Sequence, residues 1–186
     1  MGRILLVTGG ARSGKSSFAE RMIAELGADI AYIATARAFD DEMADRIDKH
    51  RLQRPASWQT FETPTEPSAV IAAEGDRFAA MLLDCLTVMV TNRMLAQPID
   101  WDRPTVRELN AVEADVMAEI EALIDAASSS RANLIAVTNE VGFGIVPQTP
   151  LARCFRDCAG RVNQRMAAVA DEVYLVVAGL PVRIKG

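Results

Sequence analysis

Short, nearly continuous runs of apolar residues recur along the chain and predict buried β-strands. They cover residues 4–8, 30–35, 79–84, 134–138 and 173–178, and a last, shorter run covers 182–185. Strands that are apolar on both faces are typical of parallel sheets with helices on each side. The pattern therefore predicts an α/β fold with a mostly parallel sheet, helices on both faces and a short antiparallel C-terminal strand.

Between these runs, apolar residues recur at helical spacing. Helices are predicted over residues 16–26, 40–54, 86–95, 105–127 and 151–170. The segment between Pro55 and the third strand contains Pro64 and Pro67 and is predicted to be a loop. Strands and helices alternate without a long linker, which predicts a single domain over residues 1–186.

Composition and charge then narrow the function. The formal net charge of −5 and the aromatic content of 5% argue against nucleic-acid binding. Three cysteines in odd number suit a reducing cytoplasm, and no apolar segment is long enough to cross a bilayer. We expect a soluble cytoplasmic protein with small-molecule partners, no nucleic-acid partner and no stable membrane insertion.

The motif G-x-x-x-x-G-K-[ST] follows the first predicted strand and opens the first predicted helix, which is the context of a phosphate-binding loop. The predicted α/β fold is therefore P-loop NTPase-like. Its residues are Gly9, Gly10, Ala11, Arg12, Ser13, Gly14, Lys15 and Ser16. Backbone N–H groups and the helix N-terminus would hold phosphates there. Lys15 would act in catalysis by reaching the β- and γ-phosphates, and the Ser16 hydroxyl would bind Mg²⁺. The alternative is a chance glycine-rich turn with a solvated lysine.

Two acidic residues follow predicted strands. Asp84 ends the third strand, where it would either bind Mg²⁺ or cap the next helix. Glu140 follows the fourth strand, where it would either orient a nucleophile or water, or cap a turn.

The single histidine, His50, lies in the predicted helix 40–54. Arg46 and Arg54 flank it at four-residue spacing, so cations surround it on the helix surface. Such a cluster suits a polyphosphate, and a histidine there could attack the α-phosphate of a nucleotide and carry it covalently. The alternative is a histidine packed at the edge of the core on a solvated basic helix.

Several segments together resemble the family of bifunctional adenosylcobinamide kinase/adenosylcobinamide-phosphate guanylyltransferases of cobalamin biosynthesis. They are GGARSGKS (9–16), YIATA (32–36), DDEMADRIDKHRLQRP (40–55), LLDCLTVMVTN (82–92), VTNEVGFGIVP (137–147), RCFRDCAGRVNQ (153–164) and ADEVYLVVAGLPVRIK (170–185). The resemblance runs nearly end to end and is weakest over residues 97–133.

The resemblance implies two reactions. In the first, the γ-phosphoryl group of ATP or GTP is transferred to adenosylcobinamide. In the second, GMP from GTP is transferred to adenosylcobinamide phosphate, giving adenosylcobinamide-GDP and pyrophosphate. In the family, a histidine at the position of His50 carries GMP as a covalent intermediate, and the assembly is a homotrimer.

The resemblance also implies further contacts for residues 9–16, 34–36 and 51–54, and for two acidic residues. Nucleotide-contacting residues beyond the phosphate loop would be Ala34, Thr35, Ala36, Arg51, Leu52, Gln53, Arg54 and Glu62, with Asp84 near the metal. A carboxylate such as Glu62 can accept from both N1–H and N2–H of guanine, which adenine cannot offer. The alternative is that Glu62 is an ordinary exposed loop residue.

Two other functions would use the same phosphate loop. One is a plain kinase of a small metabolite with His50 in a structural role, although such a kinase does not require the basic cluster. The other is a nucleotide-sensing domain that changes shape on binding GTP.

Overall fold

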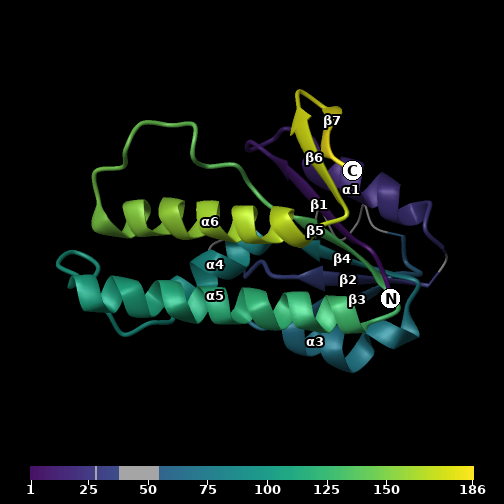
Figure 1. Ribbon diagram of the computed structural model, residues 1–186, viewed down its shortest axis with the longest axis horizontal. Coiled ribbons are helices and arrows are strands. Elements are labelled where there is room, and N and C mark those ends of the chain that lie inside the picture. The colour runs from purple at the N-terminus through teal and green to yellow at the C-terminus, as the bar shows by residue number, and fades with distance from the viewer. Residues whose placement is uncertain (28, 38–54) are drawn as a thin grey trace.

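A computed structural model describes residues 1–27, 29–37 and 55–186. The strands of these residues form one sheet in the order β3-β2-β4-β5-β1-β6-β7 (Figure 1). Their bounds are β1 (Ile4–Gly9), β2 (Ile30–Ala34), β3 (Gln59–Glu62), β4 (Ala80–Asp84), β5 (Asn133–Val137), β6 (Glu172–Val177) and β7 (Leu180–Lys185). Every pair of neighbours is parallel except β6 and β7. The mostly parallel sheet with an antiparallel C-terminal strand is thus confirmed.

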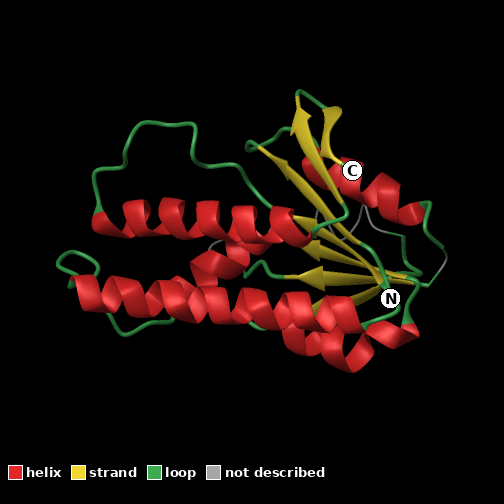
Figure 2. Cartoon of the chain, in the orientation of Figure 1, coloured by secondary structure: helices red, strands yellow, loops and turns green. Residues whose placement is uncertain are grey.

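Helices cover both faces of this sheet (Figure 2). They are α1 (Lys15–Ala24), α3 (Pro67–Glu74), α4 (Leu86–Leu95), α5 (Val106–Ser129) and α6 (Pro150–Val169), with a 3₁₀-helix η1 (Gly75–Arg77) after α3. Alternate residues of β1 point to opposite sides: Leu5 and Val7 pack with Ala19 of α1, whereas Ile4 and Leu6 join the larger core under α3 to α6. The predicted helices on both faces are confirmed.

The predicted loop after Pro55 is wrong, because it contains β3, α3 and η1. The strand β3 has only four residues, mostly exposed, at the edge of the sheet, so it lacks the apolar run that marked the other strands. Pro67 lies in the first turn of α3, where a missing N–H breaks no helical hydrogen bond. The helix predicted over residues 40–54 lies outside the described residues.

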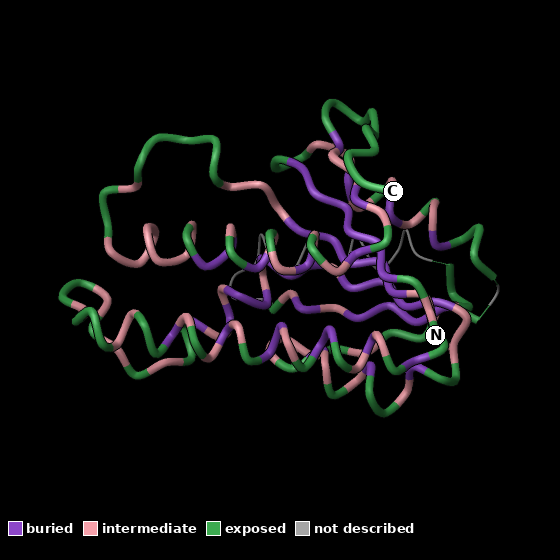
Figure 3. Tube along the Cα trace, in the orientation of Figure 1, coloured by how far each residue is buried: buried purple, intermediate pink, exposed green. Residues whose placement is uncertain are grey.

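The parallel register brings the ends of several strands to one edge of the sheet. Asp84 pairs with Ala34 of β2 on one side and with Val137 of β5 on the other, and Val137 pairs with Val7 of β1. The buried strands are seen as the purple segments in Figure 3, and α5 and α6 extend past their carboxyl ends (Figure 1). Residues that follow these strands are therefore collected at the carboxyl edge. No helix among the described residues has the length and apolarity needed to span a membrane.

Two leucines test the position of the core. Leu83 in β4 is 0% exposed, whereas Leu95 at the end of α4 is 50% exposed. Leu83→Ala should lower the free energy of unfolding by about 2–5 kcal/mol, because it leaves a cavity in a packed core. Leu95→Ala, the matched control, should change it by about 0.5 kcal/mol or less. Urea denaturation measures both values, and equal small losses would contradict the assignment of β4 to the core.

Candidate nucleotide-binding site

The loop between β1 and α1 turns sharply before the helix begins. Arg12 and Gly14 have positive φ values of 57° and 91°, and Gly14 is the N-cap of α1 without a side-chain cap. The Ser13 carbonyl accepts a 2.8 Å hydrogen bond from Gly179 N–H in the β6–β7 turn. A Cβ at Gly14 would lie 3.1 Å from the Gly179 Cα. Glycine is required at position 14 both for its conformation and for this close approach.

Lys15 is the first residue of α1 and is only 9% exposed. Its Nζ donates a 3.1 Å hydrogen bond to the Gly10 carbonyl, so the side chain curls back over the loop. Burial lowers the pKa of Lys15, and the nearby Cys85 and Asp84 only partly oppose this effect. A partly desolvated ammonium is stabilised by a negative partner. The loop therefore favours an anionic ligand such as a phosphate.

Two hydroxyl groups of the same loop region are buried without a hydrogen-bond partner among the described residues. They are the Thr8 Oγ1 at the end of β1 and the Ser13 Oγ beneath Gly9. A buried hydroxyl without a partner is unfavourable by roughly 1–3 kcal/mol. Ser16 lies half-buried in the first turn of α1, directly after Lys15. The loop thus has hydrogen-bonding capacity that the described protein atoms do not use.

Asp84 lies at the carboxyl end of β4. Its Oδ2 accepts a 3.0 Å hydrogen bond from the Tyr32 hydroxyl. The N-cap of α4 is Cys85, and no side chain caps that helix, so the alternative that Asp84 caps it is wrong. The carboxylate is instead close enough to Lys15 to favour its charged form. One cation and one carboxylate therefore lie near each other at the carboxyl edge.

Glu140 lies beside the phosphate loop through its backbone. Its N–H donates a 3.0 Å hydrogen bond to the Gly9 carbonyl, and its Oε1 accepts a 3.0 Å bond from Gly142 N–H. Glu140 was predicted either to orient a nucleophile or water, or to cap a turn. The bond from Gly142 N–H shows that its carboxylate caps a turn in this structure. The backbone contact also ties the segment after β5 to the phosphate loop.

A buried polar network, which the sequence reasoning missed, fixes that segment. The Thr138 Oγ1 donates to Asn163 Oδ1 of α6 at 2.7 Å, and Asn163 Nδ2 donates to the Asn139 carbonyl at 3.1 Å. The backbone N–H and the Nδ2 of Asn139 both reach the Thr87 Oγ1 of α4, at 2.7 and 3.1 Å. The available signal was the pair of asparagines in VTNEVG and GRVNQ. The network holds Glu140 and Gly9 in register from two helices.

The residues expected to line the nucleotide lie along the same edge. Ala34 pairs with Asp84 on one side and with Glu62 on the other, so Glu62 is the last residue of a strand and not a loop residue. Thr35 is 0% exposed, and its hydroxyl contacts the Cys85 N–H at 2.8 Å and the Cys85 carbonyl at 2.9 Å. The Thr35 side chain is therefore used within the protein, whereas Ala34 and Ala36 are half-buried at the edge.

The basic segment lies outside the described residues. This concerns the expected nucleophile His50 and the expected GTP contacts Arg51, Leu52, Gln53 and Arg54. The structure describes the chain as far as Arg37, three residues beyond the end of β2, and again from Pro55.

The three cysteines are free thiols. Burial raises the pKa of Cys85 and of Cys158 to about 12, so both are protonated near neutral pH. The Sγ atoms of Cys154 and Cys158 are 4.0 Å apart on α6, and both side chains join the larger core. They therefore pack as small apolar side chains, as their helical spacing predicts.

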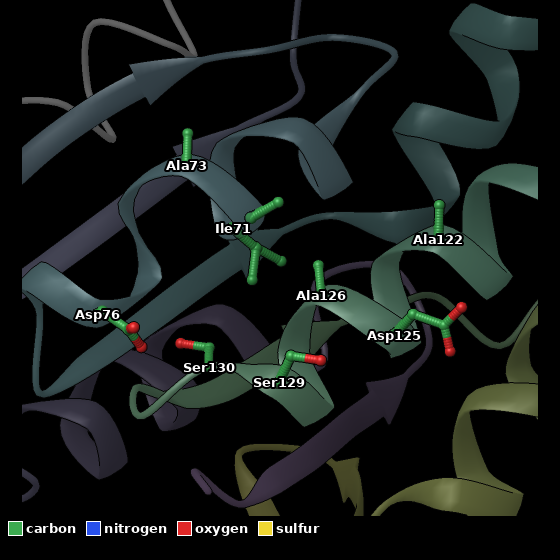
Figure 4. Close-up of a pocket in the computed structure, with 9 residues that line it drawn as sticks. Ile71, Ala73, Asp76, Ala122, Asp125, Ala126, Ser129 and Ser130 are labelled. Carbon is green, nitrogen blue, oxygen red and sulfur yellow. The ribbon is translucent and has the colours of Figure 1, made fainter.

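A cavity of about 530 Å³ lies between α3 and α5 (Figure 4). Asp76 and Ser130, which line it, come just before β4 and β5, so the cavity is at the amino edge, opposite the phosphate loop. Asp125 adds a second carboxylate, and none of its lining residues is a lysine or an arginine. It lacks the cationic groups that bind a polyphosphate.

The loop, the buried lysine and the aspartate of β4, at the carboxyl edge of a mostly parallel sheet, define a protein of the α/β class with a P-loop-like fold. A family model described as cobinamide kinase / cobinamide phosphate guanyltransferase matches residues 5–184. The chain belongs to this family, and it is therefore an enzyme of adenosylcobalamin biosynthesis.

Curated relatives span almost the whole chain. It is 48% identical over 182 residues to the bifunctional adenosylcobalamin biosynthesis protein CobU of Escherichia coli, covering 98% of this chain and 99% of the relative. It is 49% identical over 187 residues to CobU of Salmonella typhimurium, with 98% and 99% covered. It is 40% identical over 184 residues to the bifunctional protein CobP of Pseudomonas aeruginosa, with 97% and 96% covered.

Gly14→Ala tests the geometry of the phosphate loop. A Cβ at φ 91° should cost about 1–2 kcal/mol and would press on Gly179, so the loop should open and nucleotide binding should weaken. Gly144→Ala is the control, because a Cβ there meets nothing within 4 Å. We expect GTP to raise the thermal unfolding midpoint of wild type and Gly144→Ala, but much less that of Gly14→Ala. An equal GTP-induced shift in both variants would contradict the loop assignment.

Proposed function

We propose that the protein phosphorylates adenosylcobinamide with ATP or GTP, and then transfers GMP from GTP to adenosylcobinamide phosphate through His50. The observation that carries this proposal is the phosphate loop with buried Lys15 beside Asp84, in a member of a family described by both activities. The names of the relatives, which describe bifunctional proteins of adenosylcobalamin biosynthesis, support it.

In the kinase step, a hydroxyl of adenosylcobinamide would attack the γ-phosphorus, and the bond from that phosphorus to the bridging oxygen of the leaving diphosphate would break. Residues 9–16 would hold the phosphates through backbone N–H groups at the start of α1. Lys15 would neutralise charge that develops on the β- and γ-phosphate oxygens. Its hydrogen bond to the Gly10 carbonyl supports this role, because that bond holds the ammonium at the loop.

The residues present fit a Mg²⁺ ion that is bound mainly by phosphates. The described residues contain no group of three or more His, Cys, Asp or Glu side chains that could hold a metal by themselves. Mg²⁺ in nucleotide sites uses one or two protein oxygens together with phosphates and water. Ser16 and Asp84 would supply those oxygens. When bound, the ion would neutralise phosphate charge, while Tyr32 orients the Asp84 carboxylate.

In the second step, an imidazole nitrogen of His50 would attack the α-phosphorus of GTP. A P–N bond would form, the bond to the β-phosphate would break, and pyrophosphate would leave. The phosphate of adenosylcobinamide phosphate would then attack the same phosphorus and release His50. Glu62 would recognise guanine, and Ala34 and Ala36 would line the nucleotide, which their shared position at the carboxyl edge supports.

We further propose a homotrimer of single-domain subunits in the cytoplasm. The β6–β7 hairpin exposes Val177, Leu180, Val182 and Ile184, and the loop after β5 exposes a second apolar group around Phe143 and Ile145. Figure 3 shows the exposed hairpin at the upper edge of the molecule. A cyclic assembly joins two different patches of each subunit, so two separate apolar surfaces support a ring. Three free thiols support a reducing compartment.

Labelling with GTP tests the covalent intermediate. Wild-type protein incubated with α-labelled GTP and Mg²⁺ should retain label after denaturation, in a linkage that is stable in alkali and lost in acid, as expected for a phosphoramidate. The same incubation with γ-labelled GTP should leave no label, because pyrophosphate carries the γ-phosphorus away. His50→Ala should retain no α-label and should still phosphorylate cobinamide.

The two labels separate the alternatives. Retention of the γ-label with no α-label would indicate a phosphorylated enzyme and overturn GMP transfer through His50. Absence of any label in wild-type protein that phosphorylates cobinamide would leave a plain kinase.

Lys15→Ala tests the role of the phosphate loop. We expect kcat for phosphoryl transfer to fall by about 10²–10³, because the variant lacks a cation aimed at the transferred group. Lys185→Ala is the matched control: its Nζ bonds to the Ala167 and Ala168 carbonyls at the end of α6, away from the loop. An unchanged rate in Lys15→Ala would remove the loop from the mechanism.

A further inference from the structure

The last turn of α4 carries a buried amide that joins two loops. Asn92 is 3% exposed, and its Nδ2 donates to the Thr35 carbonyl at 2.8 Å and to the Pro64 carbonyl at 3.0 Å. An amide nitrogen has two hydrogens, so one side chain can satisfy both carbonyls at once. Asn92 therefore links the segment that follows β2 to the segment that follows β3.

This link begins where the pairing of the two strands ends. The Thr63 N–H donates to the Ala34 carbonyl at 3.0 Å, one residue beyond the pairing of Ala34 with Glu62. Beyond that bond, the carbonyls of Thr35 after β2 and of Pro64 after β3 accept hydrogen bonds from Asn92. The amide thus continues the connection between β2 and β3 at the level where Glu62 reaches the carboxyl edge.

The Thr35 end of the link is fixed from a second direction. Its N–H donates to the Asp84 carbonyl at 3.2 Å, and its hydroxyl contacts the Cys85 backbone at 2.8 and 2.9 Å. Loss of the Asn92 amide would therefore leave Thr35 anchored to β4, and would change the position of the β3 end, with Glu62, relative to Ala34.

The Pro64 end is held by the neighbouring side chain. Arg93 donates to the Thr65 carbonyl at 2.9 Å and forms a bidentate pair with Asp115 of α5 at 2.8 and 3.0 Å. Glu119 of α5 lies 3.5 Å from Arg93 and accepts from the Ser68 N–H at the start of α3. The segment after β3 is thus anchored to helices on the larger core, and Asn92 transmits that anchor to β2.

A packing role alone does not account for an asparagine here. The Asn92 Oδ1 is buried without a hydrogen-bond partner among the described residues, which is unfavourable. A leucine of similar shape would fill the space, but it would leave the Thr35 and Pro64 carbonyls without this donor. The two donor hydrogens of Asn92 therefore hold the two carbonyls in place, at the cost of an Oδ1 that has no partner among the described residues.

We propose that Asn92 is a positioning residue for recognition of the guanine base, acting through the strand ends that carry Ala34 and Glu62. This inference rests on the proposed function, in which Glu62 binds guanine. Hydrogen bonds weaken steeply when their distance or angle departs from the optimum. A small shift of Glu62 would therefore weaken its hydrogen bonds to the guanine base. The phosphates would be unaffected, because the phosphate loop is held by the backbone of Glu140, which follows β5, and of Gly179, in the β6–β7 turn.

Three ligands separate the base from the phosphates. GTP offers N1–H and N2–H, ITP lacks the N2 amine, and inorganic tripolyphosphate has no base. Calorimetry on Asn92→Leu should show Kd for GTP raised by about tenfold, Kd for ITP raised less, and Kd for tripolyphosphate unchanged. In guanylyl transfer by Asn92→Leu, KM for GTP should rise by a larger factor than the factor by which kcat falls.

Asn133→Leu is the matched control. Its Nδ2 also donates to a backbone carbonyl, that of Ala79 at 3.3 Å, but at the amino edge of the sheet. It should keep the wild-type ratio of GTP to ITP affinity. Asn92→Ser, which keeps one donor, should lower that ratio by about threefold and decides the question if Asn92→Leu does not fold.

The outcomes distinguish this inference from the proposed function. A folded Asn92 variant with the wild-type GTP-to-ITP ratio would overturn the positioning role while guanylyl transfer stands. Equal loss of GTP and tripolyphosphate affinity would also overturn it, because the effect would then be general. Wild-type protein that binds GTP and ITP equally would overturn both guanine recognition by Glu62 and the role of Asn92.

Discussion

The carboxyl edge of the sheet depends on one constraint: backbone groups that leave the strand ladder while still buried must find other hydrogen-bond partners. Here side chains from α4 and α6 supply them. Asn163 accepts a hydrogen bond from the Thr138 hydroxyl and donates one to the Asn139 carbonyl. Asn92 donates to the Thr35 and Pro64 carbonyls. The strand ends are therefore fixed by two of the helices that cover the larger core.

The charge of the site is set by a few buried groups at the carboxyl edge of the sheet. The protein as a whole has a formal charge of −5, yet its phosphate loop contains a buried lysine, Lys15, whose ammonium bonds to the Gly10 carbonyl of the same loop. Burial lowers the pKa of Lys15, and a single carboxylate, Asp84, is near enough to oppose this. The local balance changes in favour of the ammonium when a polyphosphate supplies several negative oxygens. An acidic protein can thus bind an acidic ligand, because the relevant field is that of a few desolvated groups.

The sequence was sufficient where a local pattern determines structure. The β1 run, the glycine spacing and Lys15 predict the phosphate loop, because strand, turn and helix start follow within a few residues of one another. It was insufficient for β3, an edge strand without an apolar run, and for α3, whose Pro67 resembles a loop signal until its place in the first helical turn is known. Glu62 was consequently expected in a loop.

The amides illustrate a different limit. The segments that resemble the family include Asn92, Asn139 and Asn163, but the partners of these amides are distant along the chain. Asn92 bonds to a carbonyl 57 residues away, and Asn163 bonds to one 24 residues away. No periodicity encodes such pairs, since each depends on which helix lies over which strand end. The Asn139–Asn163 contacts adjoin the phosphate loop between β1 and β5, whereas Asn92 joins the segments after β2 and β3. Both sets rest on α4, because Asn139 bonds to Thr87 and Asn92 lies in the last turn of that helix. They are thus separate sets of hydrogen bonds on one shared support, and a side-chain substitution can perturb one set at a time.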